Sequence, residues 1–249
     1  MSTAPKTAAV LLIGDEILSG RTQDTNLRTI AQMLGQKGIA VVEARTVPDV
    51  VDVIVESLNT LRAQVDYVFT TGGIGPTHDD RTADAVARAF GVALEQNADA
   101  MARLAKQYGG AEHITPARAK MAMVPAGARL IDNAVSGAPG FAIGNVHVMA
   151  GVPRIMQAMM EHVLPRLEGG AVIHSRSVAA AIGESTLAEA LVAAEAAHGV
   201  SVGSYPKFAP GMGPAVTIVV RGVDLDAVDC AIDAVAAAMR ARGAEPEFC

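Results

Sequence analysis

The residues best suited to chemistry gather in one glycine-rich segment, residues 70–82. It reads Thr70-Thr71-Gly72-Gly73-Ile74-Gly75-Pro76-Thr77-His78-Asp79-Asp80-Arg81-Thr82. Because glycine has no Cβ, the backbone N–H groups of such a segment can approach an anion closely. Threonine hydroxyls add further donors. The segment therefore predicts a phosphate-binding loop, whose candidate binding residues are Thr71, Gly72, Gly73, Gly75, Thr77 and Thr82.

Two adjacent carboxylates, those of Asp79 and Asp80, belong to the same segment and are its catalytic candidates. A carboxylate repels a phosphate group, and a hard cation such as Mg²⁺ removes this repulsion by bridging the two. An aspartate that acts as a base, or that accepts a hydrogen bond from a ligand N–H group, is an alternative that the sequence leaves open. If the segment were only a strand-to-helix turn, one glycine and one capping aspartate would be enough. The segment has more of both, which favours a binding role.

A second polar segment begins with Gly14, Asp15 and Glu16, directly after the first apolar run. If the first and third strands are neighbours, this segment faces residues 70–82 at the same edge of the sheet. Gly14 then joins the candidate phosphate-binding residues. Asn26 is another candidate, because its side-chain amide can reach a ligand from a helix start, although simple N-capping explains it equally well.

The elements that must position these residues alternate between strand and helix patterns. Residues 8–13 form a continuous apolar run, which is typical of a strand buried on both faces, and further strand candidates lie at residues 39–45, 65–70 and 146–149. Helical periodicity begins near residues 24, 48, 82 and 153, and residues 97–125 look helical with a break at Pro116. The order predicts a three-layer α/β/α domain with a mostly parallel sheet.

A smaller unit is expected beyond Gly169 and Gly170, the best hinge candidates. Its pattern predicts strands at 172–178, 200–205 and 215–221 and helices at 185–198 and 226–242. We therefore expect two domains, residues 1–169 and a small α+β subdomain at residues 170–249.

Composition limits the classes of function. The 249 residues are 51% hydrophobic, 18% charged and 3% aromatic, and the net charge is -6. Without a basic stripe or aromatic platform we expect no nucleic-acid partner. We also expect no signal sequence, no membrane span, reduced Cys230 and Cys249, and a cytoplasmic location. The aliphatic composition is compatible with an interface, so we expect a homo-oligomer.

The motifs resemble a known family. Residues 14–20 (Gly-Asp-Glu-Ile-Leu-Ser-Gly), 24–26 (Asp-Thr-Asn) and 71–82 resemble the molybdopterin-binding-domain superfamily. Within it they are similar to the N-terminal domain of competence/damage-inducible protein CinA and to the molybdopterin-binding-like domain of eukaryotic FAD synthase. Residues 138–141 (Ala-Pro-Gly-Phe) and 151–153 (Gly-Val-Pro) stand where that family has such segments. Residues 203–206 (Gly-Ser-Tyr-Pro) resemble the FAD synthase version.

The resemblance implies one of two activities on a small-molecule nucleotide or pterin ligand. The CinA and FAD synthase branch implies metal-dependent hydrolysis of a pyrophosphate bond in ADP-ribose or FAD. The cofactor expected there is Mg, Mn or Co, with potassium as an optional second cation, and the metal or water-activating candidates are Asp15, Glu16, Asp79 and Asp80. The other branch implies molybdopterin binding or transfer, with Asp80 at the pterin. A non-catalytic nucleotide-binding module is the third hypothesis.

The chain departs from that family at two points. Residues 115–122 lack the family's Asn-x-x-x-Gln-Ala segment, and Arg154 follows Pro153 where the family has a glutamate. Neither the amidohydrolase domain of full-length CinA nor the FAD-synthesising domain is expected, so deamidation and FAD synthesis are not assigned.

Overall fold

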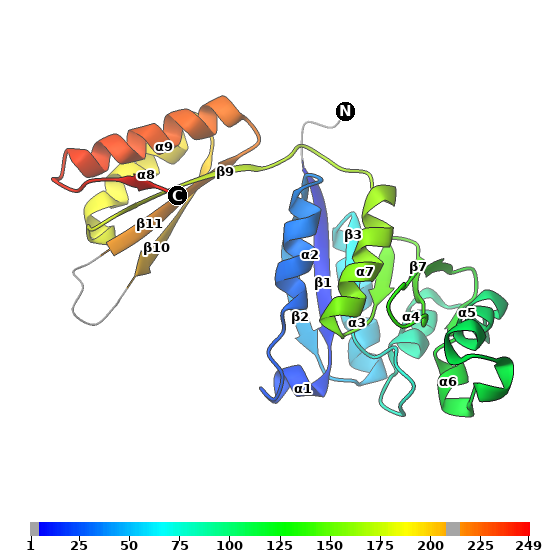
Figure 1. Ribbon diagram of the computed structural model, residues 1–249. Helices are drawn as coiled ribbons and strands as arrows, with labels where there is room; N and C mark the ends of the chain where they lie inside the picture. The colour runs from blue at the N-terminus through cyan, green and yellow to red at the C-terminus, as the bar shows by residue number, and fades with distance from the viewer. Residues whose placement is uncertain (1–4, 208–214) are drawn as a thin grey trace. The chain divides into compact units, whose positions relative to one another are not determined.

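The chain forms two compact units in the computed structural model, Met1–Gly170 and Ala171–Cys249 (Figure 1). The structure describes residues 5–207 and 215–249. The division falls one residue later than the boundary expected from the sequence. Each unit has its own hydrophobic core, so each is described by itself.

Unit 1 is built on a six-stranded sheet in the order β2-β1-β3-β8-β7-β6. The strands β2, β1, β3 and β8 are parallel, whereas β7 is antiparallel to both of its neighbours. The strands are β1 Lys6–Ile13, β2 Ile39–Val47, β3 Tyr67–Thr71, β6 Arg129–Ile131, β7 Gly140–Ile143 and β8 Val146–Met149. This confirms the mostly parallel sheet predicted from the sequence.

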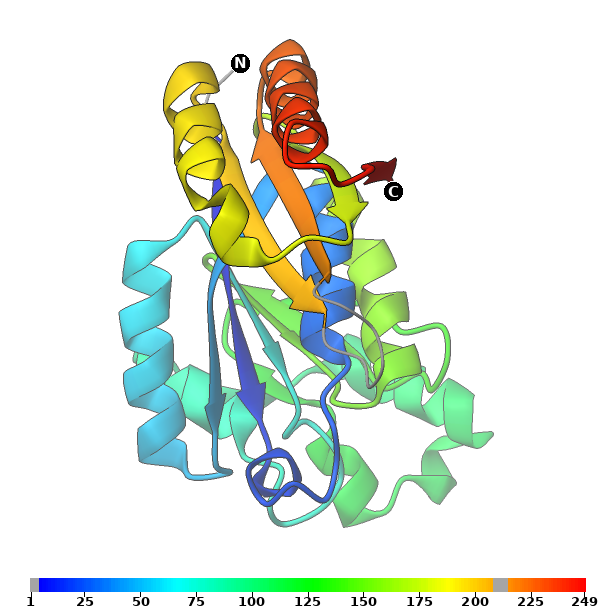
Figure 2. The same ribbon diagram turned by 90° about the vertical axis from the view of Figure 1, so that its left-hand side faces the viewer.

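Helices cover both faces of this sheet (Figures 1 and 2). Alternate residues of β1 enter the two cores: Leu11 packs with α3 and α4, and Val10 packs with α2 and α7. This is why residues 8–13 of β1 are all apolar. The helices of unit 1 are α1 Asp15–Leu18, α2 Asn26–Gly35, α3 Val51–Gln64, α4 Thr82–Phe90, α5 Ala98–Tyr108, α6 Pro116–Lys120 and α7 Pro153–Val163, with 3₁₀ turns at Ala111–His113 and Leu164–Arg166.

The stretch from residue 94 to residue 143 differs most from the sequence-based expectation. Residues 97–125, predicted to be helical with a break at Pro116, end in a strand, β5 (Met123–Pro125), which pairs with β4 (Leu94–Gln96). Pro116 begins α6 rather than breaking a helix, because its missing N–H is unpaired at a first helical position anyway. The segment read as a shaped loop at residues 136–141 contributes its last two residues to β7.

Unit 2 is a four-stranded antiparallel sheet in the order β10-β11-β9-β12, packed against two helices. Its elements are β9 His174–Ala180, α8 Glu184–His198, β10 Ser201–Lys207, β11 Ala215–Gly222, α9 Leu225–Arg240 and β12 Glu247–Phe248. The α+β subdomain predicted from the sequence is confirmed.

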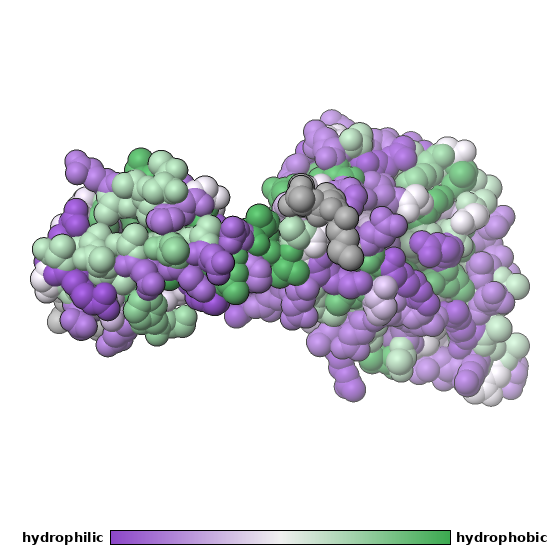
Figure 3. Space-filling view, turned by 90° about the horizontal axis from the view of Figure 1, so that it is seen from above, coloured by the Kyte–Doolittle hydropathy of each residue, from purple (hydrophilic) through white to green (hydrophobic). Residues whose placement is uncertain are grey.

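Hydrophilic and hydrophobic residues are interspersed on the visible face of each unit (Figure 3). Within the described residues, none of the helices has the length and apolar character that crossing a membrane requires.

Candidate ligand pocket

Three loop segments meet where the parallel strands end. β1 and β3 are neighbours, as the sequence predicted, with Leu12 opposite Thr71, and β8 follows with Met149 opposite Thr71. The segments after these strands are residues 14–16, 72–75 and 150–153, so they share one edge of the sheet. Open α/β sheets place their ligands at this edge.

Gly72 and Gly73 give the loop after β3 its shape. Their φ angles are +100° and +66°, in the left-handed region that glycine adopts readily. A Cβ on Gly72 would lie 2.1 Å from the carbonyl oxygen of Ile13, and one on Gly73 would lie 2.2 Å from Oγ1 of Thr82. The loop is therefore packed against the end of β1 and the start of α4 too closely for any side chain.

The backbone N–H groups of Gly73, Ile74 and Gly75 are available to a ligand. Across residues 5–207 and 215–249, these three consecutive amides donate to no protein acceptor. The nine-residue helix α4 begins shortly after them, and the positive end of its dipole favours an anion there. The arrangement suits a phosphate group better than any other common ligand group.

The loop lines a pocket of about 590 Å³, which we call the main pocket. This volume is in the usual range for small-molecule sites. Polar groups come from Glu16, Asp80, Asn133 and Ser136. The apolar part of the lining, suited to the face of a heteroaromatic ring, consists of Ile74, Tyr108, Met121, Val152, Ile155 and Met159.

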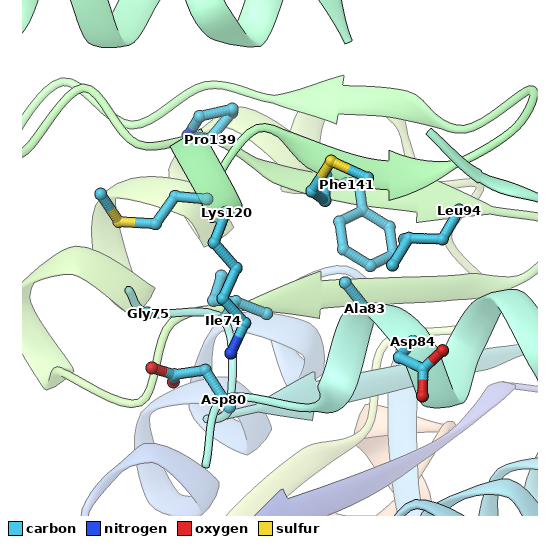
Figure 4. A pocket seen from close by; sticks show the side chains of 12 residues that line it. Ile74, Gly75, Asp80, Ala83, Asp84, Leu94, Lys120, Pro139 and Phe141 are labelled. Carbon is cyan, nitrogen blue, oxygen red and sulfur yellow. The ribbon is translucent and has the colours of Figure 1, made fainter. Parts of the chain in front are cut away.

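Asp80 is held in place by its own loop. Its Oδ2 accepts hydrogen bonds from the backbone N–H of Thr77 at 2.8 Å and from the Thr77 hydroxyl at 2.5 Å. Lys120 donates to the carbonyl oxygen of Thr77. Asp80 and Lys120 also line an adjoining cavity of about 70 Å³, where the Lys120 side chain extends toward the loop (Figure 4). A fixed carboxylate and a nearby ammonium group thus stand beside the main pocket.

Five of the candidate phosphate-binding residues, Thr77 among them, do not line the main pocket. Thr71 and Thr82 are buried, and the Thr82 hydroxyl donates to the carbonyl of Gly72 at 2.9 Å rather than capping α4. Asn26 is buried and donates from Nδ2 to the carbonyl of Gly151 at 2.7 Å. The N–H of Gly14 donates to the carbonyl of Val47.

The acidic candidates divide between two cavities. Glu16 and Asp80 line the main pocket, whereas Asp15 and Asp79 line a separate cavity of about 560 Å³, together with Asp49 and His78. The backbone N–H of Asp15 donates to Oδ2 of Asp49 at 3.0 Å. Burial raises the pKa of Asp49, and the nearby carboxylates of Asp15, Glu16 and Asp79 raise it further.

This division bears on the expected metal. No group of three or more His, Cys, Asp or Glu side chains within the described residues is placed to hold an ion. The four carboxylates therefore do not form a protein-only site in this structure. Mg²⁺ beside phosphates is usually held by one or two carboxylates and the phosphate oxygens. Glu16 and Asp80, which both line the main pocket, fit that role.

Sequence reasoning missed several residues of the site. Lys120, Tyr108 and Asn133 come from segments far along the chain, and nothing in their local sequence marks them. Asp49 was read only as part of a helix start. Its position directly after β2, which is parallel to β1, was a signal that it lies at the same edge as Asp15.

Fold and pocket together define an α/β domain with a small-molecule-sized pocket at the carboxyl edge of its sheet. Residues 9–169 match the family described as probable molybdopterin binding domain, and residues 172–247 match the one described as FAD synthase, middle domain. The chain belongs to the molybdopterin-binding-domain family, and the resemblance stated from its motifs is confirmed.

Relatives support this assignment. A CinA-like protein of Citrifermentans bemidjiense is 44% identical over 169 residues, which are 65% of this chain and 40% of that relative. A protein of Pyrococcus abyssi is 35% identical over 240 residues, covering 91% of this chain and 94% of its own length. The crystal structure of CinA from Thermoplasma acidophilum, titled as a protein with unknown function, has 38% identity and a TM-score of 0.62 over 66% of this chain and 99% of its own.

Proposed function

We propose that unit 1 binds a nucleotide of the ADP-ribose or FAD class in the main pocket and hydrolyses its pyrophosphate bond. The observation that carries the proposal is the row of three unpaired amides at Gly73, Ile74 and Gly75, which lines a pocket with an apolar wall. Such a row accommodates phosphate oxygens, and the apolar wall accommodates the base.

Two side chains supply the chemistry in this proposal. Asp80 is fixed by Thr77, so it is ready to orient a water molecule against the diphosphate or to hold a cation there. Glu16 lines the same pocket and adds a second carboxylate. A divalent ion, Mg, Mn or Co, held by these carboxylates and the ligand would neutralise the diphosphate charge. Potassium belongs to the proposal as an optional second cation.

Product analysis tests the proposal. The protein is incubated with FAD and with ADP-ribose in the presence of Mg²⁺, Mn²⁺ or Co²⁺, and AMP is measured. Metal-dependent AMP is expected, with a loss of at least about 100-fold, or close to 3 kcal/mol, in Asp80→Ala. Asp226→Ala, at an exposed position in α9 of unit 2, is the matched control and should keep full activity. If no metal yields AMP, the hydrolase proposal is wrong.

The family description favours a second function for the same pocket, the binding of molybdopterin. A pterin is also a flat heteroaromatic ring that carries phosphate, so the same amides and apolar wall suit it. Saturable pterin binding without AMP release from any nucleotide would support this function. Saturable nucleotide binding without turnover would instead support a non-catalytic nucleotide-binding module.

A further inference from the structure

A second, smaller cavity lies at the other end of the strands that carry the main pocket. It has a volume of about 120 Å³, and we call it the arginine pocket. Its polar lining consists of Tyr67, Arg129, His147, His162 and Arg166. Tyr67 is the first residue of β3, whereas the glycine loop follows its last residue. The arginine pocket is thus separate from the proposed site.

The charge of this pocket is positive and uncompensated. Arg129 and Arg166 form no ion pair with any carboxylate among the described residues. The carboxylate of Asp132 pairs with Arg103 and lies 3.2 Å from Nδ1 of His162. One Arg166 nitrogen donates to the carbonyl of His162 at 3.0 Å, which leaves its other donors free.

A buried polar side chain forms part of the wall. His147 is only 6% exposed, and its ring stacks on Phe69 with the centroids 5.1 Å apart. In the part of the chain that the structure describes, its Nδ1 has no hydrogen-bond partner. Burying an imidazole whose Nδ1 has no partner is costly. Its presence at the arginine pocket therefore points to a ligand there.

We propose that the arginine pocket binds a single phosphate group. Two guanidinium groups match the oxygens of a tetrahedral phosphate through paired N–H donors. The cavity is a fifth of the size of the main pocket and admits a phosphate but no base. The phosphate is either the free anion or the end of a phosphate monoester, and both present the same oxygens to the arginines.

Histidine NMR on the full-length chain tests this proposal without relying on activity. The imidazole signals are followed while inorganic phosphate or ribose 5-phosphate is added at constant pH and ionic strength. Saturable shifts of the His147 and His162 signals are expected. His78 lines the separate cavity with Asp15 and Asp79, so its signal serves as a reference outside the arginine pocket. Tighter binding of one of the two compounds identifies the source of the phosphate.

Variants of the two arginines test whether they cause the response to phosphate. Arg129→Gln combined with Arg166→Gln should weaken the His147 and His162 response by at least about tenfold and leave the His78 response unchanged. Arg221→Gln, an exposed arginine of unit 2, should change neither response. Shifts that persist in the double variant, or that sodium chloride produces equally, would overturn the proposal, as would His147 and His162 signals that do not move. Failure of the hydrolase proposal would leave this result unaffected.

Discussion

The side-chain amide of Asn26 donates a hydrogen bond of 2.7 Å to the carbonyl oxygen of Gly151, 125 residues further along the chain. This contact joins the start of α2 to the segment between β8 and α7. A Cβ on Gly151 would lie 3.3 Å from Cα of Gly72, so the same segment packs against the glycine loop. Asn26 therefore supports two walls of the main pocket from outside it.

Replacing this donor should weaken both the fold and the pocket. Asn26→Asp places a carboxylate oxygen against the Gly151 carbonyl in a site that is only 4% exposed. We expect a loss of about 1–3 kcal/mol in the stability of unit 1 and weaker nucleotide binding. Amide hydrogen exchange of β8 and a binding titration measure the two effects. Asn59→Asp, on exposed α3 surface, is the control, and equal behaviour of the two variants would contradict the role of Asn26.

The shape of the glycine loop yields a second prediction. Gly72→Ala should distort the loop, because its Cβ would meet the Ile13 carbonyl at 2.1 Å. Gly91→Ala is the matched control, since Gly91 also has a positive φ, +65°, but no atom within 4 Å of its Cβ. The control should lose about 1 kcal/mol of stability through φ strain alone and keep ligand binding. Gly72→Ala should lose more stability and most of its binding, as measured by thermal unfolding and nucleotide titration. Indistinguishable variants would show that close packing at Gly72 is unimportant.

The central elements of the fold could be predicted because their signals are local. Residues 8–13 of β1 are an unbroken apolar run, and Ile30 and Leu34 mark the buried face of α2. β6 and β7 gave no such signal. They have three and four residues, β7 begins with Gly140, and they exist only because they pair with each other and with β8. Strands of this length depend on tertiary pairing that no single segment reveals.

The candidate site also has a part that the sequence could predict and a part that it could not. The glycine loop was predictable, because its composition is itself the signal. The grouping of the acids was not, because successive residues of a helix point about 100° apart. Asp15 and Glu16 are adjacent in α1 and line different cavities. Asp79 and Asp80, in the loop before α4, also line different cavities. Lys120 reaches the loop from α6, a contact that no spacing in the sequence predicts.

The raised pKa of Asp49 predicts a pH-dependent stability. Burial and three neighbouring carboxylates favour its protonated form in the folded protein. The folded state therefore loses stability as the pH rises from the ordinary value of 3.8 through the raised pKa, where Asp49 ionises. Asp49→Asn keeps an acceptor for the Asp15 N–H and removes the charge. Its Tm should exceed that of the unmodified protein at pH 7, and the difference should vanish on acidification below pH 3.8.

A neighbouring aspartate provides the control. Asp52 is exposed and pairs with Arg88 at 2.8 Å, so Asp52→Asn removes an attraction rather than a repulsion. Its Tm at pH 7 should be unchanged or slightly lower. A Tm for Asp49→Asn at or below that of the unmodified protein would mean that the Asp15 hydrogen bond outweighs the crowding of carboxylates.

His147 should make unit 1 sensitive to acid in the opposite direction. Burial, together with the smaller effect of the Arg129 charge, lowers its pKa from 6.5 to about 4. Because the folded state disfavours the imidazolium, the stability that the neutral ring allows is complete above pH 6.5. It is lost as the pH falls toward 4, by roughly 3 kcal/mol over that range.

His147→Phe keeps the stacking on Phe69 and removes the titrating group. Hydrogen exchange of the β3 and β8 amides, corrected for intrinsic rates, should show this acid loss in the unmodified protein and in the exposed-site control His113→Phe, but not in His147→Phe. An equal loss in all three proteins would assign the acid sensitivity of unit 1 to its carboxylates instead.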